Sequence, residues 1–101
     1  MKKYLLIFAL IFFPNISFAD QKMDLGLEIY QNKAQCGTCH SLKAAGSTGD
    51  IGPNLDILKP QIANIIYAVT YGVGVMPPWS DILTAEEIEA VAYYVFNSTN
   101  K

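Results

Sequence analysis

The run Cys36-Gly37-Thr38-Cys39-His40 decides the interpretation of this chain, because it holds both cysteines and the only histidine of the 101 residues. Two thiols separated by two residues can reach neighbouring rings of one planar ligand from a single turn. The histidine that follows directly presents its imidazole to the same face. This spacing is typical of covalent haem attachment, in which Cys36 and Cys39 add across the two vinyl groups and His40 binds the iron.

Three other uses of a Cys-x-x-Cys pair are the alternatives. A redox-active dithiol occurs in mixed strand–helix folds, and no such pattern is found here. A structural zinc ion takes four ligands, whereas the chain offers two cysteines and one histidine. A plain disulfide would suit an exported protein. We expect one covalent haem c with its iron.

A low-spin haem also needs a second axial ligand, and His40 leaves no other histidine for that role. Apart from the initiator, the methionines are Met23, which lies close before the first predicted helix, and Met76. Met76 is followed by Pro77 and Pro78, which stiffen the backbone around it. A thioether is a soft, neutral ligand that stabilises ferrous iron and raises the reduction potential. We predict Met76 as the second iron ligand; the alternatives are core gap-filling and an open iron site suited to small ligands or peroxidase-like chemistry.

Residues 1–19 have the features of a secretory signal peptide. Lys2 and Lys3 precede an apolar stretch over residues 4–13, and Ser17-Phe18-Ala19 places small residues where a signal peptidase reads them. We expect cleavage after Ala19 and export to the periplasm. An uncleaved anchor is the alternative, but the apolar run is shorter than the roughly 18 to 20 residues that a spanning helix needs. We therefore expect no stable membrane anchor.

The predicted mature domain, residues 20–101, is small and acidic. Seven basic side chains less Lys2 and Lys3 leave five against nine acidic ones, a net charge of −4. An acidic surface disfavours binding to nucleic acid. A single apolar core is marginal at this length, so a buried cofactor that adds apolar surface is plausible on size alone.

Hydrophobic periodicity predicts short helices joined by long loops. A first helix is expected over residues 24–33, directly before the cysteines, and the glycine-rich stretch 46–53 is expected to be a loop. A second helix is expected to have Pro60 in its first turn and to stop at Gly72. Its apolar face comprises Ile62, Ile65, Ile66 and Val69.

The last helix has the clearest start. Thr84 is a good N-cap, and Glu87 three residues later completes a capping box. No alternating run is long enough to predict a strand. The sequence therefore predicts an all-α fold of three to five short helices, with long loops wrapped around one haem.

These residues together resemble class I cytochrome c in its short bacterial form. The resemblance covers essentially all of residues 20–101 and rests on the cysteine motif, the run Gly52-Pro53-Asn54-Leu55, the pair Met76-Pro77 and an aromatic last helix. It implies the cytochrome c fold. It also implies that the Pro53 carbonyl accepts a hydrogen bond from His40 and that Leu55 packs on the haem.

The resemblance further implies a contact between the first and last helices. In this family a small residue and an aromatic side chain meet at that crossing. Gly26 and Tyr30 match one side of it, and Tyr93 or Tyr94 matches the other.

The family implies a one-electron carrier of a respiratory chain, not an enzyme, with redox proteins as donor and acceptor. The acidic charge departs from the lysine-rich face of the mitochondrial form, so the docking rules of that form are not transferred. Residues 43–59 and 72–77 are similar to the small cytochrome subunits of periplasmic sulfite dehydrogenases. The alternative function is therefore a haem subunit of an enzyme complex. Donors suitable for the haem propionates are present on Asn64, Tyr71 and Trp79, and the spacing selects none of them.

Overall fold

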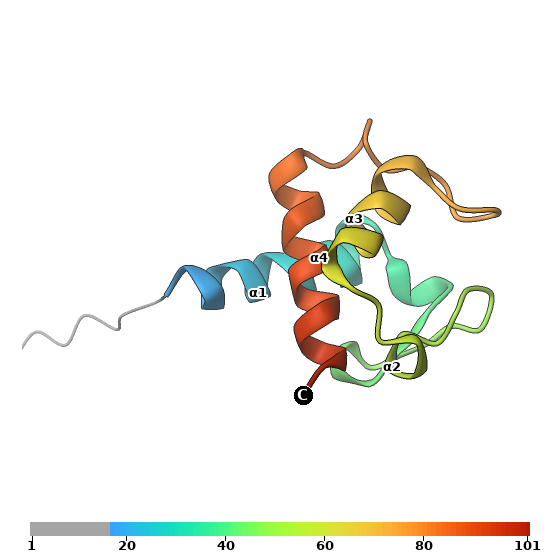
Figure 1. Cartoon of the computed structure of the whole chain (residues 1–101), viewed down its shortest axis with the longest axis horizontal. Coiled ribbons are helices and arrows are strands. Elements are labelled where there is room, and N and C mark those ends of the chain that lie inside the picture. Colours follow the sequence, from blue (N-terminus) through green and yellow to red (C-terminus); the bar gives the residue numbers. More distant parts are fainter. Residues whose placement is uncertain (1–16) are drawn as a thin grey trace, which may run out of the picture.

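The computed structural model describes residues 17–101, and α-helices make up most of the regular structure (Figure 1). The α-helices are α1 (Phe18–Glu28), α2 (Leu55–Leu58), α3 (Ile62–Tyr71) and α4 (Ala85–Thr99). A π-helical turn (Ile29–Lys33) continues α1, and two 3-10 turns occupy Cys36–Thr38 and Lys43–Ala45. Two short strands are β1 (Ser41–Leu42) and β2 (Ser47–Thr48). Within residues 17–101, no helix is both long and apolar enough to cross a membrane.

The predicted signal peptide falls almost entirely outside the described residues, which begin at position 17. Ser17 caps α1, since its hydroxyl accepts a hydrogen bond from the backbone N–H of Asp20 at 3.2 Å. The bond between Ala19 and Asp20, where cleavage is expected, lies in the first turn of α1. The first helix thus begins before the predicted range 24–33, and processing after Ala19 stays a prediction.

Helices α1 and α4 cross at Gly26, and their contact is the most extensive between helices of the domain. A methyl group at Gly26 would collide with the carbonyl oxygen of Ala90 and with Cβ of Tyr94, so only a hydrogen atom fits there. Tyr30 lies beside the crossing, with its ring centroid 6.0 Å from that of Tyr94. Of the two tyrosines that the sequence left open, Tyr94 makes this contact, and Tyr93 is only half-buried.

Helix α4 lies between α1 and α3 and contacts both (Figure 1). The side chains that face these contacts form one apolar core. Its buried members are Ile29, Tyr30, Ala34, Leu42, Leu55, Ile65, Val69, Leu83, Ile88, Val91, Ala92, Tyr94 and Val95. Helix α1 adds the buried backbone of Gly26 and the partly buried side chains of Met23, Leu25 and Leu27, which pack against this core.

Helix α3 begins two residues later than the sequence predicted. Gln61 is its N-cap with an extended backbone, and the first helical bond runs from Ile65 N to Gln61 O at 3.0 Å. Pro60 therefore precedes the helix and does not occupy its first turn. The predicted stop at Gly72 is confirmed, because Gly72 ends the helix with φ of +78°.

A hairpin follows the cysteine motif, where the sequence predicted no strand. β1 and β2 are antiparallel, with Ser41 opposite Thr48 and Leu42 opposite Ser47. Each strand has two residues, which is too short for a period-two pattern to be recognised. The hairpin is nevertheless important for the site, because it lies against the Cys36–Thr38 turn.

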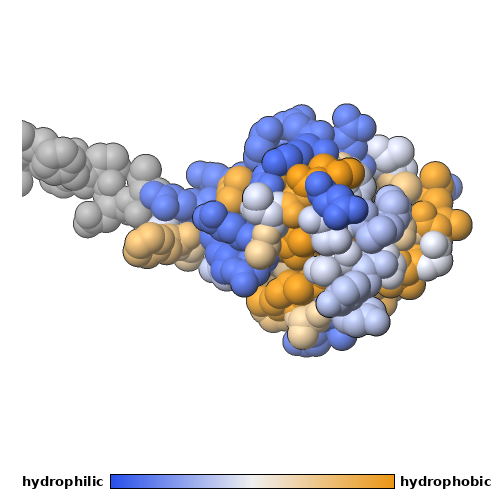
Figure 2. Space-filling view, turned by 90° about the horizontal axis from the view of Figure 1, so that it is seen from above, coloured by the Kyte–Doolittle hydropathy of each residue, from blue (hydrophilic) through white to orange (hydrophobic). Residues whose placement is uncertain are grey.

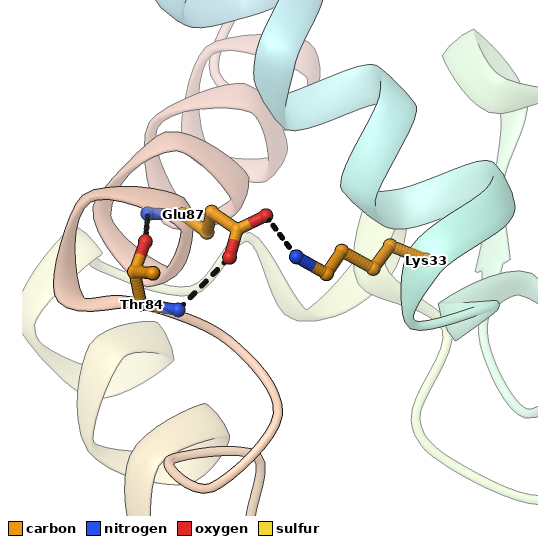
Figure 3. A network of polar contacts seen from close by, with 3 residues as sticks. All are labelled: Lys33, Thr84 and Glu87. Atoms are coloured by element: carbon orange, nitrogen blue, oxygen red, sulfur yellow. Dashed lines mark hydrogen bonds and ion pairs between the residues drawn. The ribbon is translucent and has the colours of Figure 1, made fainter.

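Figure 3 shows how the start of α4 is fixed to the end of the π-helical turn. The Thr84 hydroxyl accepts from Glu87 N at 3.1 Å, and the Glu87 carboxylate accepts from Thr84 N at 2.9 Å, so the predicted capping box is confirmed. The second oxygen of the same carboxylate accepts from Lys33 Nζ at 2.6 Å. One side chain thus caps α4 and holds it to the segment that leads into the cysteines.

This ion pair predicts an acid-dependent loss of stability. The hydrogen bond from Lys33, followed by that from Thr84 N, lowers the pKa of the Glu87 carboxyl. A carboxyl whose pKa is lower in the folded state contributes stability that is lost as the pH falls below about 4. The free energy of unfolding of the haem-loaded protein, measured from pH 7 to pH 3, should therefore fall less steeply in Glu87→Gln and Lys33→Met than in the wild type. Glu86→Gln, on the same helical turn, is the control, and equal slopes in all four proteins would contradict the prediction.

Candidate functional site

The two cysteines and the histidine lie on one tight turn. Gln35 enters it with φ of +49°, and the backbone N–H groups of Cys39 and His40 both donate to Cys36 O, at 3.1 and 3.0 Å. The two cysteines are not joined in a disulfide, and both are partly exposed. The turn therefore presents two thiols and one imidazole from a span of five residues, as the motif predicted.

The surroundings of Cys36 disfavour the charged form of its thiol. Burial raises the pKa of the Cys36 thiol to about 11. The thiol therefore stays protonated at neutral pH until it reacts. A protonated thiol is the form that adds across a vinyl group with no net loss of a proton.

The His40 imidazole is held from one side by the backbone. Its Nδ1 lies 2.8 Å from Pro53 O. A carbonyl oxygen can only accept, so Nδ1 carries the hydrogen and donates it. This leaves Nε2 as the nitrogen with a free lone pair, which is the arrangement of a metal-binding histidine. The contact is the one that the family resemblance implied.

Glycine makes this close approach possible. A Cβ at Gly52 would lie 2.5 Å from His40 Cε1 and 2.8 Å from Nδ1. The backbone N–H of Gly52 also donates to Cys39 O at 2.7 Å. The segment of Gly52 and Pro53 therefore forms a cradle that fits the imidazole in one orientation.

Met76 lies on a separate segment, the loop between α3 and α4, where it is partly buried against the core. Val73 and Met76 exchange two backbone hydrogen bonds, at 3.1 and 2.9 Å. A Cβ at Gly72 would meet Met76 O at 2.7 Å, and Trp79 N donates to Val69 O at 2.8 Å. The loop is thus tied to the end of α3 on both sides of Met76, in addition to the stiffness of the prolines.

The remaining predicted residues occupy different settings. Met23 lies on α1, partly buried against the core, which is the usual role of a methionine. Leu55 begins α2 and is buried. Among the donors considered for the haem propionates, Trp79 is partly buried, whereas Asn64 and Tyr71 are exposed.

The sequence missed one residue that contacts the cysteine turn. Tyr30 is 1% exposed, and its hydroxyl lies 2.8 Å from Ser47 Oγ and 3.3 Å from His40 O. Burial raises the pKa of this phenol to about 12. Tyr30 was predicted only as a partner in the helix crossing, and nothing in the spacing signals that its hydroxyl reaches the motif.

The donor set fits haem and does not fit a structural zinc ion. Two thiols on one turn, an imidazole with Nδ1 already engaged, and a glycine cradle behind the ring suit a c-type haem. Zinc would need further ligands, and residues 17–101 contain no group of three His, Cys, Asp or Glu side chains that could hold a metal ion.

The chain is similar to known proteins over most of its length. Residues 21–95 match the family model described as cytochrome C oxidase, cbb3-type, subunit III. The chain is 33% identical to cytochrome c6 of Pyropia yezoensis over 102 residues, covering 93% of this chain and 86% of that one. It is 35% identical to the chloroplastic cytochrome c6 of Chlamydomonas reinhardtii over 83 residues, which cover 72% of this chain but only 53% of that relative.

A solved structure extends the similarity to three dimensions. The crystal structure of the c-type cytochrome SorU from Sinorhizobium meliloti superimposes with a TM-score of 0.75 at 48% identity. The match covers 81% of this chain and 95% of that one. The mostly helical arrangement with long loops is therefore shared with a c-type cytochrome.

Proposed function

Because the chain belongs to the cytochrome c family, as a short class I monohaem member, we propose that it carries single electrons in the periplasm with His40 and Met76 as axial ligands of its iron. It is a c-type cytochrome with covalently bound haem c, and its class is that of electron carriers. The observation that supports His40 as an iron ligand is the 2.8 Å contact from its Nδ1 to Pro53 O, which leaves Nε2 free for iron.

In this proposal each residue of the site has a defined task. Cys36 and Cys39 supply the two thioether bonds. The bound haem supplies an iron that alternates between the ferric and ferrous states. His40 stays in one orientation because Nδ1 donates to Pro53 O, a bond that also makes the ring a stronger ligand. Met76 favours the ferrous state, and since both ligands sit on fixed backbone, little rearrangement accompanies the change of charge.

The test of this ligand set is the replacement Met76→Ala. We expect the methionine-to-ferric-iron charge-transfer band to disappear. We also expect the reduction potential to fall by a substantial part of the roughly 0.8 V range that axial ligands span. The potential falls because the soft thioether that stabilises ferrous iron is lost. Absorption spectroscopy and a redox titration of the haem-loaded protein measure both effects.

Met23→Ala is the matched control, because it removes the other methionine of residues 20–101 from a core position. It should lower stability and leave the band and the potential unchanged. A Met76→Ala protein that keeps the wild-type band and potential would rule out the axial pair. An open iron site would then be the better description.

The periplasmic location is part of the proposal and rests on the features of residues 1–19. Fractionation of the native cells and sequencing of the protein's N-terminus test it directly. The expected result is a periplasmic protein beginning at Asp20. A product that still begins at Met1 in the membrane fraction would contradict it.

A haem subunit of an enzyme complex, for example a sulfite dehydrogenase, is the second candidate, and exposed valines favour it. Val73 and Val75 lie in the loop just before Met76 and are 58% and 85% exposed. Figure 2 shows hydrophobic residues gathered at the end of the molecule farthest from the start of α1, the end toward which this loop projects in Figure 1. A protein partner could bury such a surface. Size-exclusion chromatography of the protein from its own cells decides: co-elution with a larger partner supports this candidate, and a lone monomer contradicts it.

A further inference from the structure

Tyr30 is a buried core residue whose hydroxyl lies at the edge of the core and contacts the cysteine turn. Its ring packs at 6.0 Å from Tyr94, and the side chain is 1% exposed. Its oxygen lies 2.8 Å from Ser47 Oγ on β2 and 3.3 Å from the carbonyl oxygen of His40. Three segments therefore meet at this hydroxyl: the π-helical turn, the cysteine motif and the hairpin.

The direction of these hydrogen bonds follows from counting hydrogens. Each hydroxyl has one hydrogen to donate, and a carbonyl can only accept. If Tyr30 donates to His40 O at 3.3 Å, Ser47 donates to Tyr30 at 2.8 Å, and every group has a partner. If Tyr30 donates to Ser47 instead, Ser47 must use its 3.5 Å contact with Leu42 O, and Tyr30 no longer donates to His40 O. The first arrangement uses the shorter contacts. We therefore assign Ser47 as the donor to Tyr30 and Tyr30 as the donor to His40 O.

The hairpin that supplies Ser47 packs closely against the cysteine turn. A Cβ at Gly37 would lie 2.6 Å from Cβ of Ser47, and one at Gly49 would lie 2.6 Å from Gly37 O. Ser41 Oγ also donates to Gly49 O at 2.9 Å. The hairpin therefore contacts the backbone of the cysteine motif, and the Tyr30 ring lies beside the same contact at Gly37.

We propose that Tyr30 is a positioning residue for the haem iron: its hydroxyl fixes the His40 peptide group, while Pro53 fixes the other end of the same residue at Nδ1. The inference rests on the proposed role of His40 as an iron ligand. A residue held at its carbonyl and at its ring has little freedom to rotate about the bonds between them. Loss of the Tyr30 hydroxyl then changes the plane in which the imidazole meets the iron.

The test is Tyr30→Phe, which keeps the ring and its packing and removes only the hydroxyl. In the ferric haem-loaded protein, the proton NMR positions of the four haem methyl groups depend on the plane of the axial imidazole. We expect Tyr30→Phe to redistribute these four shifts and to change the reduction potential. Tyr94→Phe is the matched control, since it removes the hydroxyl from the ring beside Tyr30 and is expected to leave the methyl pattern as in the wild type.

Ser47→Ala tests the direction of these hydrogen bonds. It leaves Tyr30 free to donate to His40 O, so its effect on the methyl pattern should be smaller than that of Tyr30→Phe. An unchanged pattern in Tyr30→Phe, or equal changes in Tyr30→Phe and Tyr94→Phe, would overturn the proposal. The wild-type absorption spectrum tests the ligand proposal separately, because a missing methionine-to-ferric-iron band counts against Met76. Redistributed haem methyl shifts in Tyr30→Phe would still support Tyr30 as a positioning residue for His40.

Discussion

Replacing Gly52 with alanine is expected to displace the His40 ring and to lower the free energy of unfolding of the haem-loaded protein by about 1–3 kcal/mol, the usual cost of added atoms in a packed site. The new Cβ would lie 2.5 Å from Cε1 and 2.8 Å from Nδ1 of that ring. Two hydrogen bonds hold the backbone in place: Gly52 N donates to Cys39 O, and Pro53 O accepts from the His40 ring. Guanidinium unfolding measures the loss, and the ferric spectrum shows whether the imidazole keeps its position.

Gly46→Ala is the control for this experiment. Gly46 lies in the connection between β1 and β2 with φ of +67°, and a Cβ there meets nothing within 4 Å. Only left-handed backbone strain is expected, about 1–2 kcal/mol, with an unchanged ferric spectrum. A Gly52→Ala protein with wild-type stability and spectrum would show that the cradle around His40 is looser than the structure indicates.

Replacing Gly26 with valine is expected to have the larger effect on the fold. Even one added carbon collides with the Ala90 carbonyl and with Cβ of Tyr94, and valine adds three. Overpacking usually costs about 1–3 kcal/mol and sometimes more. A collision with α4 belongs at the upper end, because the atoms met are backbone and Cβ atoms, which cannot rotate away. Against a typical total stability of about 5–15 kcal/mol, we expect a lower yield of folded protein and a much lower midpoint of thermal unfolding.

The comparison for Gly26→Val is Gly74→Ala, where the added carbon meets nothing within 4 Å. That variant should lose only the strain of its positive φ, which is +57°. Thermal unfolding followed by circular dichroism distinguishes the two. Similar midpoints for Gly26→Val and the wild type would mean that α1 can slide on α4, contrary to the close crossing seen here.

Features that depend on a local rule were predictable from the sequence. The capping box of Thr84 and Glu87 depends on hydrogen bonds within one turn, and it is present. Gly72 ends α3 because a positive φ is needed there, and its φ is +78°. The Cys36–His40 turn follows from its spacing, and its contact with Pro53 followed from the family resemblance.

Features that depend on packing between distant segments were not predictable. The Tyr30 hydroxyl reaches His40 O only because the hairpin and the π-helical turn meet at one place. The strands of two residues are set by contact with the motif and carry no alternation of their own. Pro60 was predicted to lie in the first turn of α3. In the structure Gln61 has an extended backbone and caps the helix, which therefore begins at Ile62.

The π-helical turn over Ile29–Lys33 has a consequence for how this fold can vary. In it Ala34 N bonds to Ile29 O at 2.8 Å, five residues back, so the segment holds one residue more than an α-helical turn would. One extra residue shifts the point at which the chain leaves the helix by about 100° around the helix axis. Gly26 faces α4, and Cys36 belongs to the haem-binding motif. The π-helical turn between them sets the direction of the motif relative to the face that Gly26 presents to α4. A single-residue deletion here would leave α1 seated on α4 while turning the thiols and His40 toward a different side, so the spacing between glycine and cysteine is as much a part of the haem site as the cysteine motif itself.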